Sequence, residues 1–224
     1  TRTESLASDF HARDNVTKAS LALDKDGRFM GLKVSTKANL GGYLNYFGPH
    51  SPTNNLGGLS GVYTTPHIFA EVSGVYTHTS PTAPYRGAGR PEASYVLERL
   101  IEVAATDIGY DPIDLRRRNI ISKDSLPYNT GFVFTYDTGE FETVMDKAIE
   151  AADYKNIAKR KSTSASKGKL LGIGFASVIE IAGGPHPKPM EESASIRFES
   201  DGGLTLALGT HSHGQAHERA FRQI

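Results

Sequence analysis

Residues 85–93 read Tyr85-Arg86-Gly87-Ala88-Gly89-Arg90-Pro91-Glu92-Ala93, and they join a predicted strand to the longest helical pattern in the sequence. The strand is predicted at 68–78 from its β-branched and aromatic residues, and the helix at 91–110 from apolar residues at helical spacing. Glycines let a backbone approach a ligand closely, and proline suits the first position of a helix. The amides at the helix start, with Arg86 and Arg90, predict a site for an anion such as phosphate. A tight turn with solvated arginines is the alternative.

The composition excludes several classes of protein. Lys plus Arg and Asp plus Glu both number 25, so no broad basic field exists to attract nucleic acid or an anionic membrane. No apolar run in these residues is long enough to cross a bilayer, and they contain no signal-peptide pattern. The absence of cysteine excludes disulfides, iron–sulfur ligation and thiolate metal sites within these 224 residues.

Both ends of the chain look interrupted. The first residue is threonine, and Ile224 falls a few residues into a helical pattern. We therefore expect the sequence to be an internal piece of a longer polypeptide.

Local patterns along the chain predict an α+β fold, with mixed or antiparallel sheets on which helices pack. One hairpin is expected around Asp24-Lys25-Asp26-Gly27 and another around Asp201-Gly202-Gly203. His11-Ala12-Arg13-Asp14 is interpreted as an exposed or strand-end segment rather than a catalytic cluster. Further helices are expected at 111–119 and 141–152, a short strand at 132–136, a buried strand at 170–182, and a rigid loop at 183–189. The arginines at 116–118 predict a solvated face with one buried salt bridge.

The chain divides into two related subdomains in this interpretation. Residues 1–154 form the first, 155–169 a basic linker, and 170–224 the second. In each subdomain a hairpin and strand lead into a glycine loop that opens a helix, at 86–92 and again at 209–218. Two such loops could hold one elongated anionic ligand. A nucleic-acid patch or a contact surface for a partner subunit is the alternative for the basic segment.

Other site chemistries are less well supported by the residues. A Rossmann dinucleotide site would need a third glycine at Glu92, whose charge would also repel a phosphate unless the loop arginines dominate. His211, His213 and His217 could converge on a metal in a histidine-based metallohydrolase, but no carboxylate falls at zincin spacing. Ordering of a cofactor loop by these polar residues is the favoured interpretation. A non-catalytic module that binds a partner or an unrelated anion is a further alternative.

The chain contains an ordered set of motifs, namely Arg2-Thr3-Glu4-Ser5, Asn39-Leu40-Gly41-Gly42-Tyr43, Ala83 to Ala93, Asp111-Pro112, Leu115 to Asn119, Pro127-Tyr128, Tyr136-Asp137-Thr138-Gly139 and Ser212 to Glu218. This set resembles the molybdenum-binding large subunit of the xanthine dehydrogenase/aldehyde oxidase/carbon monoxide dehydrogenase family. The similarity covers nearly the whole chain.

The resemblance implies a cytoplasmic hydroxylase with a molybdenum–molybdopterin cofactor, often in the cytosine dinucleotide form. Such an enzyme inserts a water-derived oxygen into an aldehyde or N-heteroaromatic substrate and passes electrons to two [2Fe–2S] clusters and FAD. Because this chain has no cysteine, those centres are expected on an iron–sulfur small subunit and an FAD-binding medium subunit, in a dimer of heterotrimers.

The resemblance also implies roles for particular residues. Asn54 and Tyr85 would line the substrate pocket, and Gln215 would bond a cofactor oxygen or a pterin edge. The family's glutamate base would lie beyond Ile224, and its phenylalanine–glycine loop before Thr1. We therefore assign no catalytic residue and no metal ligand here and expect the isolated chain to be inactive. The expected cofactor-binding residues are Arg86, Gly87, Ala88, Gly89, Gly214, Gln215 and Ala216.

The chain also departs from the family pattern. Gly87 stands where carbon monoxide dehydrogenases carry a copper-binding cysteine, which argues against oxidation of carbon monoxide. Ala88 replaces an aromatic residue of xanthine oxidases, and Asn54 lies near the place of their substrate-orienting arginine, which weakens a purine assignment. Ala216 replaces the glycine that usually follows the loop glutamine.

Overall fold

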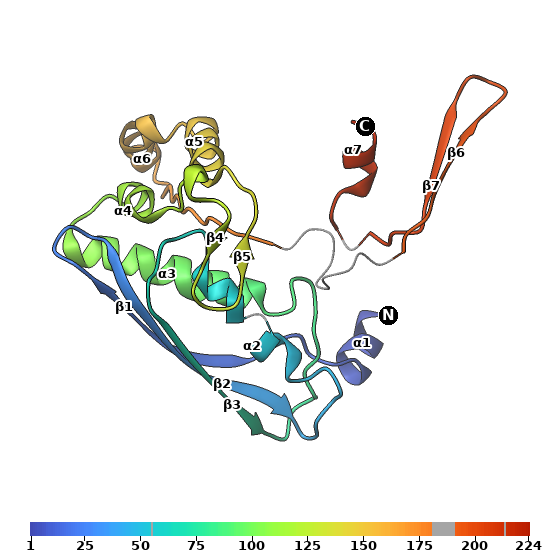
Figure 1. The fold of residues 1–224 in the computed structure, drawn as a ribbon, viewed down its shortest axis with the longest axis horizontal. Coiled ribbons are helices and arrows are strands. Elements are labelled where there is room, and N and C mark those ends of the chain that lie inside the picture. The colour runs from blue at the N-terminus through green and yellow to red at the C-terminus, as the bar shows by residue number, and fades with distance from the viewer. Residues whose placement is uncertain (55, 181–190, 213) are drawn as a thin grey trace. The chain divides into compact units, whose positions relative to one another are not determined.

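The computed structural model describes residues 1–54, 56–180, 191–212 and 214–224 (Figure 1). Its contacts divide the chain into two units, Thr1–Ile179 and Glu180–Ile224. The rigid loop predicted at 183–189 lies outside the described residues.

A three-stranded mixed sheet forms the base of the first unit. Its order is β1 (Asn15–Leu23), β2 (Phe29–Gly41), β3 (Ile68–Tyr76); β1 and β2 are antiparallel, and β2 and β3 are parallel. The turn between β1 and β2 is held by the Asp24 carboxylate, which accepts the amides of Asp26 at 2.9 Å and Arg28 at 2.8 Å. The predicted hairpin is therefore confirmed.

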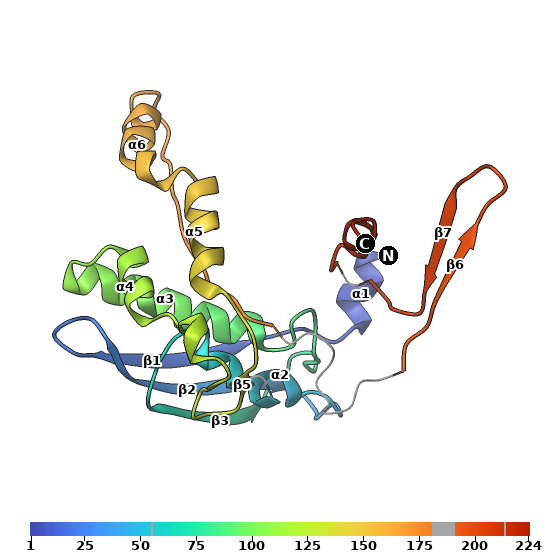
Figure 2. The same ribbon diagram turned by 45° about the horizontal axis from the view of Figure 1, so that its top comes forward.

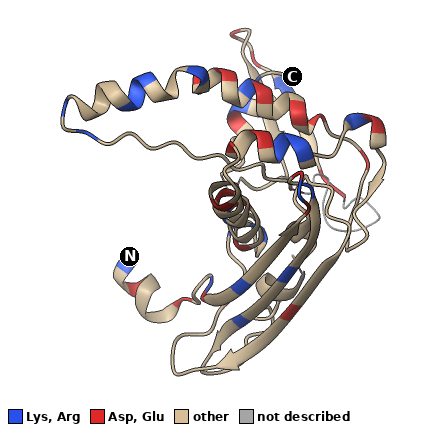
Figure 3. Ribbon diagram, turned by 90° about the vertical axis from the view of Figure 1, so that its left-hand side faces the viewer, with Lys and Arg blue, Asp and Glu red and all other residues tan. Residues whose placement is uncertain are grey.

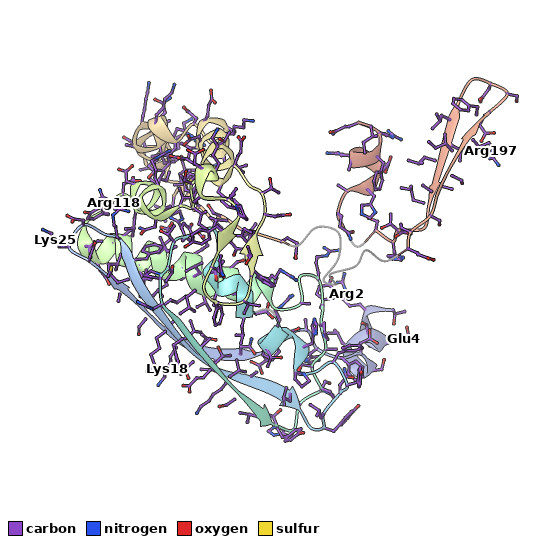
Figure 4. The ribbon with its side chains drawn as sticks, in the orientation of Figure 1. Arg2, Glu4, Lys18, Lys25, Arg118 and Arg197 are labelled. Atoms are coloured by element: carbon purple, nitrogen blue, oxygen red, sulfur yellow. The ribbon has the colours of Figure 1, made fainter. Side chains whose placement is uncertain are left out.

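Helix α3 (Arg90–Ile108) covers one face of this sheet (Figures 1 and 2). Its apolar residues recur every three or four positions, as predicted, and pack on the inward side chains of β2. Gly109 ends the helix with φ of 73°, where glycine avoids the strain of a left-handed backbone. The opposite face of the sheet carries Lys18, which projects away from α3 (Figure 4). The buried cluster includes Phe29, Leu32, Val34, Leu59, Val62, Tyr63, Leu97, Ile101 and Ala105.

Short elements complete the first unit. Helix α4 (Pro112–Asn119) begins after Asp111, whose carboxylate caps the amides of Ile113 and Asp114. Figure 3 shows α3 lying between the sheet and α4. At the far end of the sheet Arg118 lies beside Lys25 (Figure 4), and its guanidinium donates to the carbonyl of Asp26 at 2.5 Å. The remaining elements are α1 (Arg2–Ser8), α2 (His50–Asn54), η1 (Leu56–Ser60), α4 (Pro112–Asn119), η2 (Lys123–Ser125), β4 (Tyr128–Asn129), β5 (Thr135–Tyr136), α5 (Phe141–Ala151), η3 (Tyr154–Asn156) and α6 (Ile157–Ala165).

A buried ionic network joins α3 and α4. The guanidinium of Arg116 donates to Glu98 at 2.9 Å, forms an ion pair with Glu102 at 2.8 Å and donates to the Phe175 carbonyl at 3.1 Å. Tyr63 donates its hydroxyl to the other oxygen of Glu98 at 2.7 Å, and burial together with that carboxylate raises the pKa of Tyr63. The prediction of one buried salt bridge among three arginines is therefore confirmed.

The prediction of a buried strand at 170–182 is wrong for its described part, since residues 170–180 form no strand. Side chains at odd positions from Leu171 to Ile179 are half-buried, whereas those between them are exposed. The alternation correctly indicates an extended backbone, but a strand also requires a pairing partner, and no described strand pairs with this segment.

The basic segment 155–169 contains most of η3 and all of α6 rather than an unstructured connection. The boundary between the two compact units falls after Ile179, whereas the sequence predicts the linker between the subdomains at 155–169. The subdomain boundaries themselves stay a prediction.

The second unit contains the predicted hairpin of β6 (Ala194–Phe198) and β7 (Leu204–Leu208), followed by α7 (His217–Phe221). Both units thus lead a strand through a glycine loop into a helix, as expected for the α+β fold. Across the described residues, no helix is both long and apolar enough to cross a membrane.

Candidate functional site: a glycine loop at the start of the longest helix

The loop before α3 has three successive residues with positive φ, namely Gly87 at 85°, Ala88 at 45° and Gly89 at 106°. Two hydrogen bonds close it, from the Ala88 amide to the Tyr85 carbonyl at 2.8 Å and from the Arg90 amide to the Gly87 carbonyl at 2.9 Å. A Cβ atom at Gly87 would lie 2.7 Å from the ring of Pro91, so the loop accepts only glycine there.

This geometry leaves donors available at the start of the helix. Within the described ranges, no protein acceptor bonds the amides of Gly87 and Gly89. The Arg86 guanidinium is exposed, and it lies 5.9 Å from the centre of the Tyr85 ring. These two amides, the nearby positive charge of Arg86 and the N-terminal end of a 19-residue helix together suit a negatively charged ligand.

Tyr85, an expected pocket residue, is exposed at the entrance to this loop. The Arg13 guanidinium also lies 5.9 Å from its ring centre, so two cations approach the same aromatic ring. The side chain of Asn54, the other expected pocket residue, is outside the described structure.

Arg13 is a residue of this site that the sequence analysis missed. Its Nη2 donates to the carbonyls of Tyr85 at 2.9 Å and Arg86 at 2.8 Å, and its Nε pairs with Glu92 at 2.9 Å. The approach is set by backbone pairing, because the His11 amide bonds the Pro81 carbonyl and its carbonyl accepts the Ala83 amide, both at 2.9 Å. No local pattern could reveal a contact between residues more than seventy positions apart.

Glu92 occupies the first turn of α3 and points into the protein. Its Oε2 atom and the hydroxyl of Ser51 are buried and have no hydrogen-bond partner among the described residues. Both residues line a cavity of about 40 Å³ beneath Gly89. A cavity of this size has room for a water molecule, which these two polar atoms could bind. The pairing with Arg13 removes the repulsion that a free carboxylate at this position would exert on an anion.

The second glycine loop, before α7, also uses left-handed backbone. Gly214 has φ of 104° and Ala216 has φ of 59°. An alanine in this conformation costs roughly 1 kcal/mol, which gives a physical reason for the glycine that the family resemblance expects there. Gln215 is exposed beside these residues.

The histidines near this loop do not show a metal centre in the described structure. No group of three His, Asp or Glu side chains suited to a metal occurs in the parts of the chain that are described, and His213 is outside them. The ring of His217 instead lies 5.2 Å from that of Phe221.

The two glycine loops belong to different units, residues 1–179 and 180–224. Joint binding of one ligand by Arg86 and Gln215 therefore stays a prediction.

Comparison with known proteins identifies similar sequences over the whole chain. Two sequence models, each described as a molybdopterin cofactor-binding domain, match residues 1–120 and 147–224. The carbon monoxide dehydrogenase large chain of Hydrogenophaga pseudoflava is 32% identical over this entire chain, which covers 29% of that relative. Subunit gamma of the 6-hydroxypseudooxynicotine dehydrogenase complex of Paenarthrobacter nicotinovorans is 29% identical over the entire chain, which covers 28% of it.

The structure also resembles solved proteins. Quinoline 2-oxidoreductase from Pseudomonas putida 86 matches with a TM-score of 0.81 and 27% identity, covering 100% of this chain and 30% of the solved one. The chain thus spans less than a third of the length of each of these proteins.

Proposed function

The chain belongs to the molybdopterin cofactor-binding proteins of the carbon monoxide dehydrogenase and xanthine dehydrogenase family, and from this premise we propose a cofactor-holding role for its two glycine loops. The proposed activity of the whole protein is that of a molybdenum hydroxylase. The present chain would supply part of the catalytic large subunit.

The shape of the loop at 85–89 is the observation that supports the proposal most directly. Molybdopterin carries a phosphate group, and the loop offers two amides that have no acceptor among the described residues, an exposed arginine and backbone without a Cβ at Gly87. These donors fit the anionic part of the cofactor. We therefore assign the binding of that part to Arg86, Gly87 and Gly89, with Ala88 shaping the loop between them.

The second loop would hold another edge of the same cofactor. Gln215 carries an amide that can both donate and accept, which suits a pterin ring edge. The positive φ angles of Gly214 and Ala216 bend the backbone on either side of it. When bound, the molybdenum cofactor supplies the oxidation chemistry, with an oxygen that originates from water. The residues of this chain would position the cofactor and shield it.

We infer an aldehyde or an N-heteroaromatic compound as substrate. The names of two similar proteins, quinoline 2-oxidoreductase and 6-hydroxypseudooxynicotine dehydrogenase, refer to nitrogen-containing aromatic compounds. Gly87 in place of the copper-binding cysteine argues against carbon monoxide. The exposed ring of Tyr85 offers a flat surface on which a planar substrate could stack.

The absence of cysteine supports a division of labour among subunits. In this proposal, iron–sulfur clusters and FAD are carried by a small and a medium subunit, and two such heterotrimers associate. The cytosine dinucleotide form of the cofactor and a cytoplasmic location are parts of the same proposal.

Replacement of Arg86 by alanine in the complete enzyme tests the cofactor site. Loss of a charge-assisted hydrogen bond to an anion costs about 1.5–3 kcal/mol, which corresponds to roughly 10- to 150-fold weaker binding. Molybdenum and pterin content per protein, measured by metal analysis and by fluorescence of the oxidised pterin, should fall accordingly. Arg99→Ala, which removes an exposed arginine from the same helix, should leave both contents unchanged.

The outcome also separates the proposal from its alternatives. Unchanged molybdenum content and turnover in the Arg86→Ala enzyme would remove the site assignment. Stoichiometric zinc without pterin in the unmodified enzyme would indicate a histidine-based metallohydrolase. A complex with neither would indicate a non-catalytic binding module.

A further inference from the structure

We propose that Arg13 is a positioning residue that holds the glycine loop in its anion-binding shape and neutralises the carboxylate beneath it. This inference rests on the proposed function of the loop and assigns the cause of its geometry to a residue outside the motif. Arg13 itself would not touch the cofactor.

The first part of the argument concerns the direction of the loop amides. In a trans peptide unit, the N–H group points away from the carbonyl of the same unit. The Arg86 carbonyl points at Nη2 of Arg13, at 2.8 Å, so the amide of Gly87 in that unit points to the opposite side. The bond to the Tyr85 carbonyl, at 2.9 Å, orients the preceding peptide unit, which contains the Arg86 amide, in the same way. Arg13 thereby sets the face on which the loop presents its donors.

The second part concerns charge. The side chain of Glu92 is 19% exposed and that of Arg13 is 31% exposed, so their ion pair at 2.9 Å is partly shielded from solvent. The second oxygen of Glu92 has no hydrogen-bond partner among the described residues, which leaves Arg13 as the ion-pair partner that the structure shows for this carboxylate. Without Arg13, an unpaired negative charge would lie in the first turn of the helix whose start receives the anion. Its repulsion would oppose the attraction of Arg86.

The third part concerns the choice of arginine. A guanidinium offers five donors in a rigid plane, so it can reach two carbonyls and one carboxylate at once. A lysine has a single charged nitrogen and a flexible stem. Lysine at this position could retain the ion pair with Glu92 but not all three contacts in the same geometry.

Three variants of the complete enzyme test the proposal: Arg13→Gln, Arg13→Lys and the double variant Arg13→Gln/Glu92→Gln. We expect Arg13→Gln to lower molybdenum and pterin content roughly tenfold or more, as for the loss of charge-assisted contacts. The molybdenum and pterin content of Arg13→Lys should lie between that of Arg13→Gln and that of the unmodified enzyme. The double variant should recover part of the loss, because it removes the unpaired carboxylate. Arg117→Gln is the matched control, since Arg117 is also a partly exposed arginine in an ion pair but lies on α4.

Hydrogen exchange of the cofactor-free enzyme provides a readout that does not depend on activity. In Arg13→Gln, the amides of Ala88 and Arg90, whose hydrogen bonds close the loop, should exchange faster, while those of the buried part of α3 exchange at the unmodified rate. Arg117→Gln should leave both regions unchanged.

Two results would overturn the inference. Full cofactor content in Arg13→Gln would show that the loop holds its shape without the arginine. Faster exchange across the entire sheet and helix would instead show a general structural role for Arg13. A complete absence of molybdenum from the unmodified enzyme would refute the proposed function, and the exchange experiment would then decide the positioning role alone.

Discussion

Replacement of Arg116 by methionine should destabilise the protein far more than the same change at its neighbour Arg117. Both arginines lie on α4, and each contacts two carboxylates. They differ in burial, because the Arg116 side chain is 0% exposed and the Arg117 side chain is 38% exposed. The pair therefore compares a buried with an exposed arginine on the same helix, each with two carboxylate partners, although Arg116 also donates to the carbonyl of Phe175.

The expected magnitude follows from what each substitution leaves behind. The carboxylate of Glu98, which is 5% exposed, has two described side-chain partners, Arg116 and Tyr63. Without Arg116, it keeps only the hydrogen bond from the Tyr63 hydroxyl. The carbonyl of Phe175 also loses its donor. Breaking a buried ion pair by removing one partner costs about 3–5 kcal/mol, whereas an exposed pair contributes about 1 kcal/mol or less. We expect losses in those two ranges for Arg116→Met and Arg117→Met.

Equilibrium unfolding in urea measures both losses against the unmodified protein. The slope of free energy against urea concentration should be equal in all three proteins, which would confirm that the native state stays equally compact. Adding Glu98→Gln to Arg116→Met should recover part of the stability, since no unpaired charge then remains buried. Equal losses for the two methionine variants would refute the reasoning, because burial would then have no influence on the value of the ion pair.

Two further predictions concern backbone strain and ionisation. Gly41→Ala should cost at least about 2 kcal/mol in the free energy of unfolding, because φ is 79° and the new Cβ would lie 2.6 Å from the Pro81 nitrogen. Gly109→Ala, with φ of 73° but open space around it, should cost only about 1–2 kcal/mol, and thermal unfolding that ranks the two alike would contradict this. Burial raises the pKa of Tyr136, whose hydroxyl donates to the Gly61 carbonyl at 2.7 Å, to about 12. Its contribution to stability is thus fully present below a pH of about 10 and is lost at about 1.4 kcal/mol per pH unit as pH rises from there towards 12. Unfolding curves at pH 9 and 11 should show a smaller alkaline loss in Tyr136→Phe than in the unmodified protein, and identical losses would contradict the assignment.

The features that sequence predicted well are those set by neighbouring residues. The turn at 24–27 and the start of α4 at Asp111 depend on side chains that bond amides two to four positions away. The period of apolar residues in α3 reports one buried face in the same local way. The glycine loop at 87–89 is predictable because positive φ angles favour glycine.

The features that sequence could not predict depend on distant partners. The parallel pairing of β2 with β3 spans a connection that contains α2 and η1, and nothing in either strand specifies its direction. The segment 170–180 has the alternation of a strand but no described strand beside it. The basic and polar residues of 157–165 predict a solvated linker, whereas the structure forms helix α6 there. Because this helix has no buried residue, its sequence lacks the apolar pattern that would indicate it.

The dependence of the glycine loop on Arg13 limits how far the motif can be transplanted. A peptide or a graft that carries residues 83–93 into another scaffold would bring the glycines and Arg86 but leave behind the guanidinium that bonds the carbonyls of Tyr85 and Arg86. Such a graft would have the sequence of the motif but lack the contacts that hold the loop backbone in its conformation. Engineering this recognition element elsewhere would therefore require moving two separate pieces of chain together, with the His11 pairing that aligns them.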